Sequence, residues 1–138
     1  MSDMKKRVLF VCTHNSARSQ MAEAFLNSTY GDRYEASSAG TEPTGVNPRV
    51  VEAMKEIGFD LSRNLSKSVD EFLGRTIDLV LTVCDHAQET CPFFPGGLKR
   101  DHRGFRDPGS CRGSEEEIMA CVRLIRDEIA AWVREYFR

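Results

Sequence analysis

Residues 8–19 of the chain read VLFVCTHNSARS, and this stretch joins a buried strand to a helix through a loop that begins with a cysteine. The four residues from Val8 to Val11 are apolar and rich in β-branched and aromatic types, which is typical of a short buried strand. Cys12 ends this strand, and from Gln20 onward apolar residues recur at helical spacing. The stretch therefore predicts a strand, a polar loop and a helix N-terminus in direct succession.

The loop from Thr13 to Ser19 has the features of an anion-binding site. At a helix N-terminus, backbone N–H groups lack intrahelical partners and the helix dipole favours negative charge. Arg18 stands six positions after Cys12, so a loop that curls back can place its guanidinium group on an oxyanion above the sulfur. The same positive field favours the thiolate of Cys12, and the Ser19 hydroxyl can donate a hydrogen bond to it. The alternative is a core cysteine and a solvated arginine, which an isolated C-x5-R pattern would favour. The strand, the helix and Ser19 argue against that alternative here.

The overall composition is that of a single soluble domain. The chain has 138 residues, of which 41% are hydrophobic and 29% charged, and its formal net charge is −2. This charge argues against nucleic acid or an anionic membrane as the main partner. The apolar run after the N-terminal residues is too short for a signal peptide, and no stretch reaches membrane-spanning length. We therefore expect a cytoplasmic protein.

Further strands and helices are predicted along the chain. Residues 34–39 alternate like a strand that ends at Gly40, residues 77–83 are almost continuously apolar, and residues 99–105 form a weaker, charged candidate for a sheet edge. Helices are predicted to begin at Asn47-Pro48 and to occupy residues 66–73. Strands that alternate with helices indicate a parallel sheet with both faces covered, whose ligands bind at the carboxyl ends of the strands.

The last helix carries the clearest start signal. Ser114 followed by Glu117 forms a capping box, and six apolar residues recur at helical spacing: Ile118, Val122, Ile125, Ile129, Trp132 and Tyr136. Cys121 falls on this face, so we assign it to core packing. The role of Cys111 stays open.

Two further cysteines point to redox chemistry. The five cysteines stand at positions 12, 84, 91, 111 and 121, and an odd count without a secretion signal favours reactive thiols over a disulfide framework. Cys84 follows the strand 77–83, so it emerges at the same sheet edge as Cys12 and can form a disulfide with it. We expect residues 85–90 to be a polar connection, continued by Pro92 and residues 95–97, from which Cys91 can attack Cys84.

Two alternatives compete with this relay. A metal site could be formed by Cys84, His86, Cys91 and His102, but their spacing lacks the paired arrangement that is typical of zinc. The other alternative is that Cys84 and Cys91 are simply buried apolar residues, which their polar neighbours disfavour.

The motif from Cys12 to Ser19 resembles the phosphate-binding loop of the low-molecular-weight protein tyrosine phosphatase superfamily, which includes thiol-dependent arsenate reductases. Cys84, Cys91 with Pro92, and the run from His102 to Pro108 resemble the thioredoxin-coupled arsenate reductases. The resemblance implies an α/β three-layer sandwich with a central four-stranded parallel sheet flanked by helices, as one domain over residues 1–138. It also implies arsenate as substrate and thioredoxin as reductant, and we expect a monomer that requires no metal or organic cofactor.

The resemblance assigns a role to each candidate residue. The residue matching Cys12 attacks arsenate, the one matching Cys84 resolves the adduct, and the one matching Cys91 takes over the disulfide for thioredoxin. Asp107 is the candidate general acid, with a turn-forming Asp before Pro as its alternative. Asn15 is expected to hold the loop conformation, because Asn tolerates left-handed backbone geometry. The oxyanion is expected to bind to the loop Thr13, His14, Asn15, Ser16, Ala17, Arg18 and Ser19.

Other features separate the two branches of the superfamily. The phosphatase branch usually has an aromatic residue just after its Asp-Pro, whereas here Asp107-Pro108 is followed by Gly109-Ser110. The loop also departs from the pattern at His14, where phosphatases commonly have Gly, and at Ala17, where many members have a second cysteine. The alternatives are a tyrosine phosphatase that uses Cys12, Arg18 and Asp107, and a non-enzymatic oxyanion or redox sensor.

Overall fold

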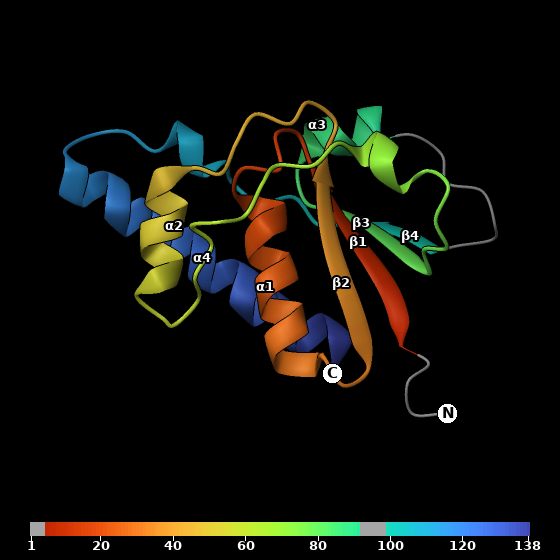
Figure 1. Cartoon of the computed structure of the whole chain (residues 1–138). Coiled ribbons are helices and arrows are strands. Elements are labelled where there is room, and N and C mark those ends of the chain that lie inside the picture. The colour runs from red at the N-terminus through yellow and green to blue at the C-terminus, as the bar shows by residue number, and fades with distance from the viewer. Residues whose placement is uncertain (1–4, 92–98) are drawn as a thin grey trace.

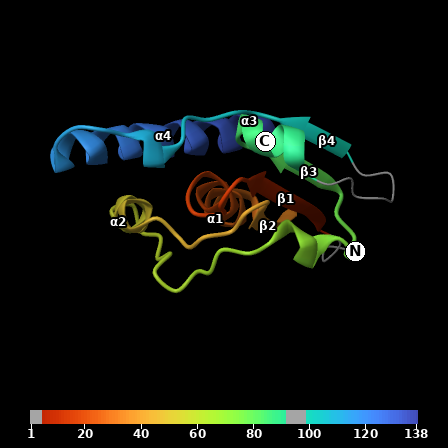
Figure 2. The same cartoon turned by 90° about the horizontal axis from the view of Figure 1, so that it is seen from above.

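The computed structural model describes residues 5–91 and 99–138, and its centre is one parallel sheet. The strands lie in the order β2-β1-β3-β4, and helices flank the sheet (Figures 1 and 2). Their bounds are β1 Lys6–Cys12, β2 Tyr34–Gly40, β3 Leu79–Thr82 and β4 Lys99–His102. The predicted α/β class with four parallel strands is therefore confirmed, and β4 is the charged edge strand that the sequence indicates.

Of the four α-helices in the described residues, all but α3 begin close to where the sequence signals them. Their bounds are α1 Arg18–Tyr30, α2 Pro48–Lys55, α3 Asp85–Thr90 and α4 Glu115–Phe137. The side chain of Asn47 accepts a hydrogen bond from Arg49 N and so caps α2, with Pro48 in the first turn. The helix predicted over 66–73 is shorter, a 3₁₀ turn over Val69–Phe72 that we label η1, and a second such turn, η2, covers Pro108–Ser110.

The core lies between the sheet and the helices, and β1 runs through its middle. Val8 to Val11 are almost fully buried, and each such side chain contributes about 1.5–3 kcal/mol by leaving water. Phe10 packs edge-on against Trp132 and Phe137 of α4. α1 packs on β1, β2 and α4, which fixes the helix N-terminus at the carboxyl end of the central strand. In the described residues, no helix combines the length and the apolar character needed to cross a bilayer.

The expectation of a polar connection over residues 85–90 is wrong, because these residues form α3. The Cys84 sulfur accepts a hydrogen bond from Ala87 N at 3.4 Å, and Ala87 is fully buried. Asp85 in the first turn complements the helix dipole. These contacts stabilise a helix that its polar composition does not indicate, and Pro92 and residues 95–97 lie outside the described residues.

The capping box of α4 is confirmed, but the buried face is rotated from the predicted one. Ser114 and Glu117 exchange side-chain to backbone hydrogen bonds, as predicted. Tyr136, predicted on the core face, is 40% exposed because its hydroxyl donates to Asp101 Oδ2 at 2.7 Å. Ile118 and Trp132 are only half-buried. The buried side chains are Met119, Val122, Ile125, Arg126, Ile129, Val133 and Phe137.

Candidate active site

The loop after β1 leads into the N-terminus of α1, which has no side-chain cap. The carbonyl groups of Cys12, Thr13 and His14 accept hydrogen bonds from backbone N–H groups of residues 41, 42 and 44. Ala17, at the N-cap position, supplies no side-chain cap. The carbonyls of the loop thus face a neighbouring segment, while the first N–H groups of the helix can be satisfied by an anion.

Asn15 and Gly40 set the shape of this loop. Asn15 has φ 50°, in the left-handed region that Asn tolerates, and its Oδ1 accepts a hydrogen bond from Lys67 N at 2.8 Å. A Cβ atom at Gly40 would lie 2.6 Å from Thr13 O and 2.7 Å from Asn15 N, so only glycine allows β2 to approach the loop. The sequence pattern marks Gly40 only as the end of a strand, because its approach to the loop is a tertiary contact.

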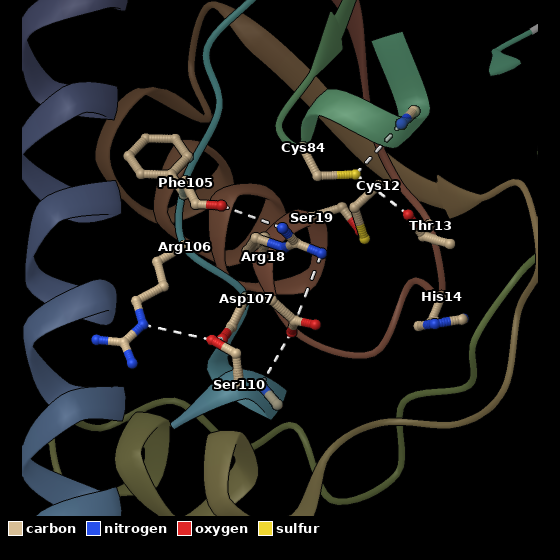
Figure 3. A network of polar contacts seen from close by, with 12 residues as sticks. Cys12, Thr13, His14, Arg18, Ser19, Cys84, Phe105, Arg106, Asp107 and Ser110 are labelled. Carbon is tan, nitrogen blue, oxygen red and sulfur yellow. Dashed lines mark hydrogen bonds and ion pairs between the residues drawn. The ribbon is translucent and has the colours of Figure 1, made fainter. Parts of the chain in front are cut away.

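Cys12 lies at the end of a chain of hydrogen bonds inside the loop. Its side chain is buried, and its sulfur lies 2.9 Å from Ser19 Oγ. Asn15 Nδ2 donates to the same Ser19 oxygen at 2.8 Å, which leaves the Ser19 hydroxyl hydrogen to point at the sulfur. Figure 3 shows Cys12 and Ser19 side by side at the start of α1. A hydroxyl donor favours the thiolate, the nucleophilic form of cysteine.

Arg18 is a buried cation with one donor that stays open. Its Nη1 donates to Phe105 O at 3.1 Å, and its Nη2 lies 4.0 Å from Asp107 Oδ1. Its buried Nε has no hydrogen-bond partner among residues 5–91 and 99–138. A buried guanidinium is stable only when its donors are satisfied, so this N–H can bind an oxyanion held by the loop.

Asp107 caps a turn and also lies near Arg18. Its Oδ1 accepts a hydrogen bond from Gly109 N at 2.9 Å and so caps the turn η2. The same carboxylate faces Arg18 and is about half-exposed (Figure 3). The geometry is compatible with a general acid that is also the N-cap of its turn.

Cys84 meets the loop at the carboxyl end of β3. Its sulfur lies 3.3 Å from the hydroxyl oxygen of Thr13, the residue after Cys12. Val83 N donates to Val11 O, so the ends of β1 and β3 are paired and the predicted common edge is confirmed. Figure 3 shows the Cys84 side chain directed toward Cys12 and Thr13. The sheet thus brings together two thiols that are 72 positions apart in the sequence.

Cys91 lies beyond α3 and is only 8% exposed. Burial raises the pKa of its thiol, and the positive charge of Arg100 opposes that rise. Seven positions of helical rise place its Cα about 10 Å from that of Cys84, whereas a disulfide needs about 7 Å or less. Cys84 and Cys91 can therefore pair only if α3 unwinds. Both side chains are buried, as in the alternative that their polar neighbours disfavour.

The remaining candidates lie in the loop or near it. Thr13, His14 and Ser16 are half-buried, and Ala17 is buried. His14 Nδ1 pairs with Glu42 O at 2.9 Å, which directs its ring toward the segment after β2. No group of three His, Cys, Asp or Glu side chains in the described parts of the chain is arranged to hold a metal ion.

Cys121 packs against the core as assigned, but it also forms a disulfide with Cys111, at a Cα–Cα distance of 6.0 Å, which the sequence does not predict. Cys121 is only half-buried and turns from α4 toward the loop that contains Cys111. The bond closes a loop of ten residues and ties the segment after Asp107 to α4. The ten-residue spacing alone does not reveal the pairing, because Gly113, at φ 117°, reverses the chain between the two cysteines.

We expect alkylation of the denatured, unreduced protein to label three of its five cysteines, leaving Cys111 and Cys121 protected. Replacing Cys111 by serine should add one labelled thiol and lower the free energy of unfolding by roughly 2–3 kcal/mol, the value for so short a closed loop. Mass spectrometry and urea unfolding measure the two effects. The double variant Cys111→Ser/Cys121→Ser should match the single one, and five labelled cysteines in the parent would contradict the pairing.

Comparison with known proteins relates the whole chain to two activities. Residues 7–137 match the family model described as low molecular weight phosphotyrosine protein phosphatase. A protein of Halalkalibacterium halodurans named arsenate reductase is 46% identical over 132 residues, which are 96% of this chain and 95% of that protein.

Two solved structures extend the comparison. An arsenate reductase in an oxidized state has a TM-score of 0.77 and 26% identity and covers 94% of this chain and 95% of its own. A low molecular weight protein tyrosine phosphatase from T. tengcongensis has a TM-score of 0.78 and 26% identity, with 96% and 97% covered. The fold is therefore shared by both activities and does not separate them.

Proposed function

We propose that this chain, which belongs to the low molecular weight phosphotyrosine protein phosphatase family, is an arsenate reductase that works through Cys12, Cys84 and Cys91. The observation that carries the proposal is the 3.3 Å contact between the Cys84 sulfur and Thr13 Oγ1. Phosphate-ester hydrolysis needs a nucleophile, an arginine and an acid in this fold. A second thiol beside the nucleophile adds the ability to form a disulfide with it, which is redox chemistry.

The first step uses the loop and Cys12. The N–H groups of the loop and Arg18 hold the oxygens of arsenate while the Cys12 thiolate attacks the arsenic. One arsenate oxygen leaves as water, with Asp107 as the proposed proton donor. The product is an adduct in which the Cys12 sulfur is bonded to arsenic(V).

The second step uses Cys84. Its thiolate attacks the Cys12 sulfur, the sulfur–arsenic bond breaks, and the electron pair of that bond stays on arsenic. Arsenic(V) thereby becomes arsenic(III), arsenite leaves, and Cys12 and Cys84 are oxidised to a disulfide. One arsenate and two thiols give one arsenite, one water and one disulfide, so atoms and electrons balance.

The third step moves the disulfide to α3. The Cys91 thiolate attacks Cys84 and expels the Cys12 thiolate, which restores the nucleophile for the next arsenate. Thioredoxin, a protein dithiol, then reduces the Cys84–Cys91 disulfide. The exposed polar side chains of α3 support this assignment, because they place the helix at the surface where a protein reductant can reach it.

The phosphatase alternative is favoured by one observation, the position of Asp107 near Arg18. Such a pair would serve ester hydrolysis without either Cys84 or Cys91. The residues after Asp107-Pro108 are Gly109 and Ser110, which give no aromatic ring against which a phosphotyrosine could stack. We therefore place reduction of arsenate first.

We expect arsenate to drive NADPH consumption when the protein is mixed with thioredoxin and thioredoxin reductase. The same preparation should hydrolyse a phosphate ester such as p-nitrophenyl phosphate far more slowly, because Gly109 and Ser110 offer its ring no aromatic partner. A matched control replaces Cys84 by serine, which should stop the arsenate-dependent consumption and leave any ester hydrolysis unchanged. Ester hydrolysis without arsenate-dependent consumption would favour the phosphatase, and neither reaction would favour the sensor.

A further inference from the structure

Helix α3 is attached to strand β4 at both of its ends. At the N-terminal end, Asp85 Oδ1 lies 2.9 Å from His102 Nε2. At the C-terminal end, Arg100 Nη2 donates to the carbonyl oxygen of Cys91 at 2.9 Å. Arg100 and His102 are two positions apart on the strand, so both project from the same face of the sheet. Both views of the fold show α3 beside β3 and β4 (Figures 1 and 2).

Two neighbouring residues, Thr82 and Gly104, shape the contact between Asp85 and His102. His102 Nδ1 lies 2.7 Å from the hydroxyl of Thr82, a buried residue of β3, and this bond orients the ring toward Asp85. A Cβ atom at Gly104 would lie 2.8 Å from Asp85 Oδ1 and 3.4 Å from His102 Nε2. A larger residue at this position would have to displace the Asp85 carboxylate, whereas Gly104 leaves room for the pair.

Among the described residues, few other contacts stabilise α3. It is six residues long, and isolated helices of that length are unstable in water. Within α3, the side chain of Ala87 is buried. The exposed His86 places its Nε2 3.5 Å from Glu42 Oε2. Helical geometry in this segment therefore depends on tertiary contacts, among which those to β4 hold both ends.

We propose that His102 and Arg100 are positioning residues that keep α3 helical and thereby hold Cys91 away from Cys84. The inference deepens the proposed function and rests on it for its biological meaning. A Cys84–Cys91 disulfide requires α3 to unwind, and unwinding separates Asp85 from His102 and Cys91 from Arg100. These contacts stabilise the dithiol over the disulfide, so β4 sets how readily the relay passes its disulfide to Cys91 and how readily thioredoxin reduces it.

The test measures the Cys84–Cys91 equilibrium in full-length protein that carries Cys12→Ser, so that no arsenate is needed. The protein is equilibrated with mixtures of reduced and oxidised dithiothreitol and then alkylated. Peptide mass mapping quantifies the Cys84–Cys91 disulfide separately from the Cys111–Cys121 one. In this background, His102→Ala removes the strand partner of the Asp85–His102 contact, and Asp85→Ala removes the helix partner. The Asp85 side chain is 89% exposed.

We expect each variant to shift the equilibrium toward the disulfide by about fivefold, since the pair is partly exposed, which corresponds to about 20 mV toward more negative potential. The double variant should shift it no further than the single ones, because both remove the same contact. Lys99→Ala, on the opposite face of β4, and Glu89→Ala, on α3, are the matched controls and should leave the equilibrium unchanged. An unchanged or more positive potential in both contact variants would overturn the proposal, as would a fully additive double variant.

The two proposals fail in different ways. If the equilibrium shifts as expected but the parent protein does not reduce arsenate, the role of β4 stands and the proposed function falls. If the parent protein reduces arsenate but the equilibrium does not move, the proposed function stands and the role of β4 falls.

Discussion

Replacing Cys12 by serine is expected to abolish arsenate reduction, with a loss on the order of 10⁴-fold or more. Two physical reasons combine. A serine hydroxyl is protonated at neutral pH and is a far weaker nucleophile than a thiolate held by Ser19. Moreover, an oxygen–arsenic bond cannot be resolved by Cys84 to a disulfide, so no electron pair reaches arsenic even if an adduct forms.

The variant should lose chemistry while it keeps the binding site. Arg18, the loop amides and the hydrogen bond between Asn15 and Ser19 do not depend on the sulfur, so titration calorimetry with arsenate should still detect binding. Arsenate-dependent NADPH consumption in the thioredoxin-coupled assay measures the loss. Cys121→Ser is the matched control, because it replaces a cysteine outside the relay and should retain turnover. Turnover by Cys12→Ser near that of the parent would show that another group is the nucleophile.

The sequence was sufficient to predict the parts of the fold that depend on local pattern. Residues 8–19 predict a strand, a loop and a helix in succession, and Ser114 with Glu117 predicts the start of α4. Both signals depend only on residues that are close together in the sequence. Parallel pairing then follows from the alternation of strands and helices, and it places Cys84 at the edge where Cys12 lies.

The parts that could not be predicted depend on contacts between distant segments. The polar residues 85–90 become helical because Cys84, Ala87 and strand β4 hold them. Gly40 is required by its approach to Thr13, and Cys111 reaches Cys121 only because the chain turns back before α4. On α4, the Tyr136 hydroxyl donates a hydrogen bond to Asp101, and the Tyr136 ring stays partly exposed. The spacing of hydrophobic residues cannot predict such a hydrogen bond.

The structure also changes the view of the second cysteine pair. Spacing alone allows Cys84 and Cys91 to exchange a disulfide across a flexible connection. In the proposed relay, the helix between them adds a conformational step, and we infer that its contacts with His102 and Arg100 give that step a cost that the sequence does not reveal.

Replacing Cys91 by serine is expected to stop the enzyme after one arsenate, because Cys12 and Cys84 alone supply the two electrons that one reduction requires. The reaction then ends at a Cys12–Cys84 disulfide. Both side chains are buried, at 2% and 3% exposure, and forming this bond does not require the surface helix α3 to unwind, so a protein reductant has less access to it than to a Cys84–Cys91 disulfide. Quenched-flow assays should find about one arsenite per protein, followed by steady turnover at least about 100-fold below the parent.

The single arsenite released per protein and the disulfide that remains afterwards can be tested separately. Peptide mapping after the burst should recover Cys12 joined to Cys84, while the same experiment on Cys84→Ser should yield no arsenite and no such disulfide. Cys111→Ser, which leaves all three relay thiols in place, should turn over continuously. Sustained thioredoxin-coupled turnover by Cys91→Ser would mean that the reductant reaches the Cys12–Cys84 bond directly. In that case α3 would have no part in the transfer, because its unwinding matters only if the disulfide must leave the buried loop before it can be reduced.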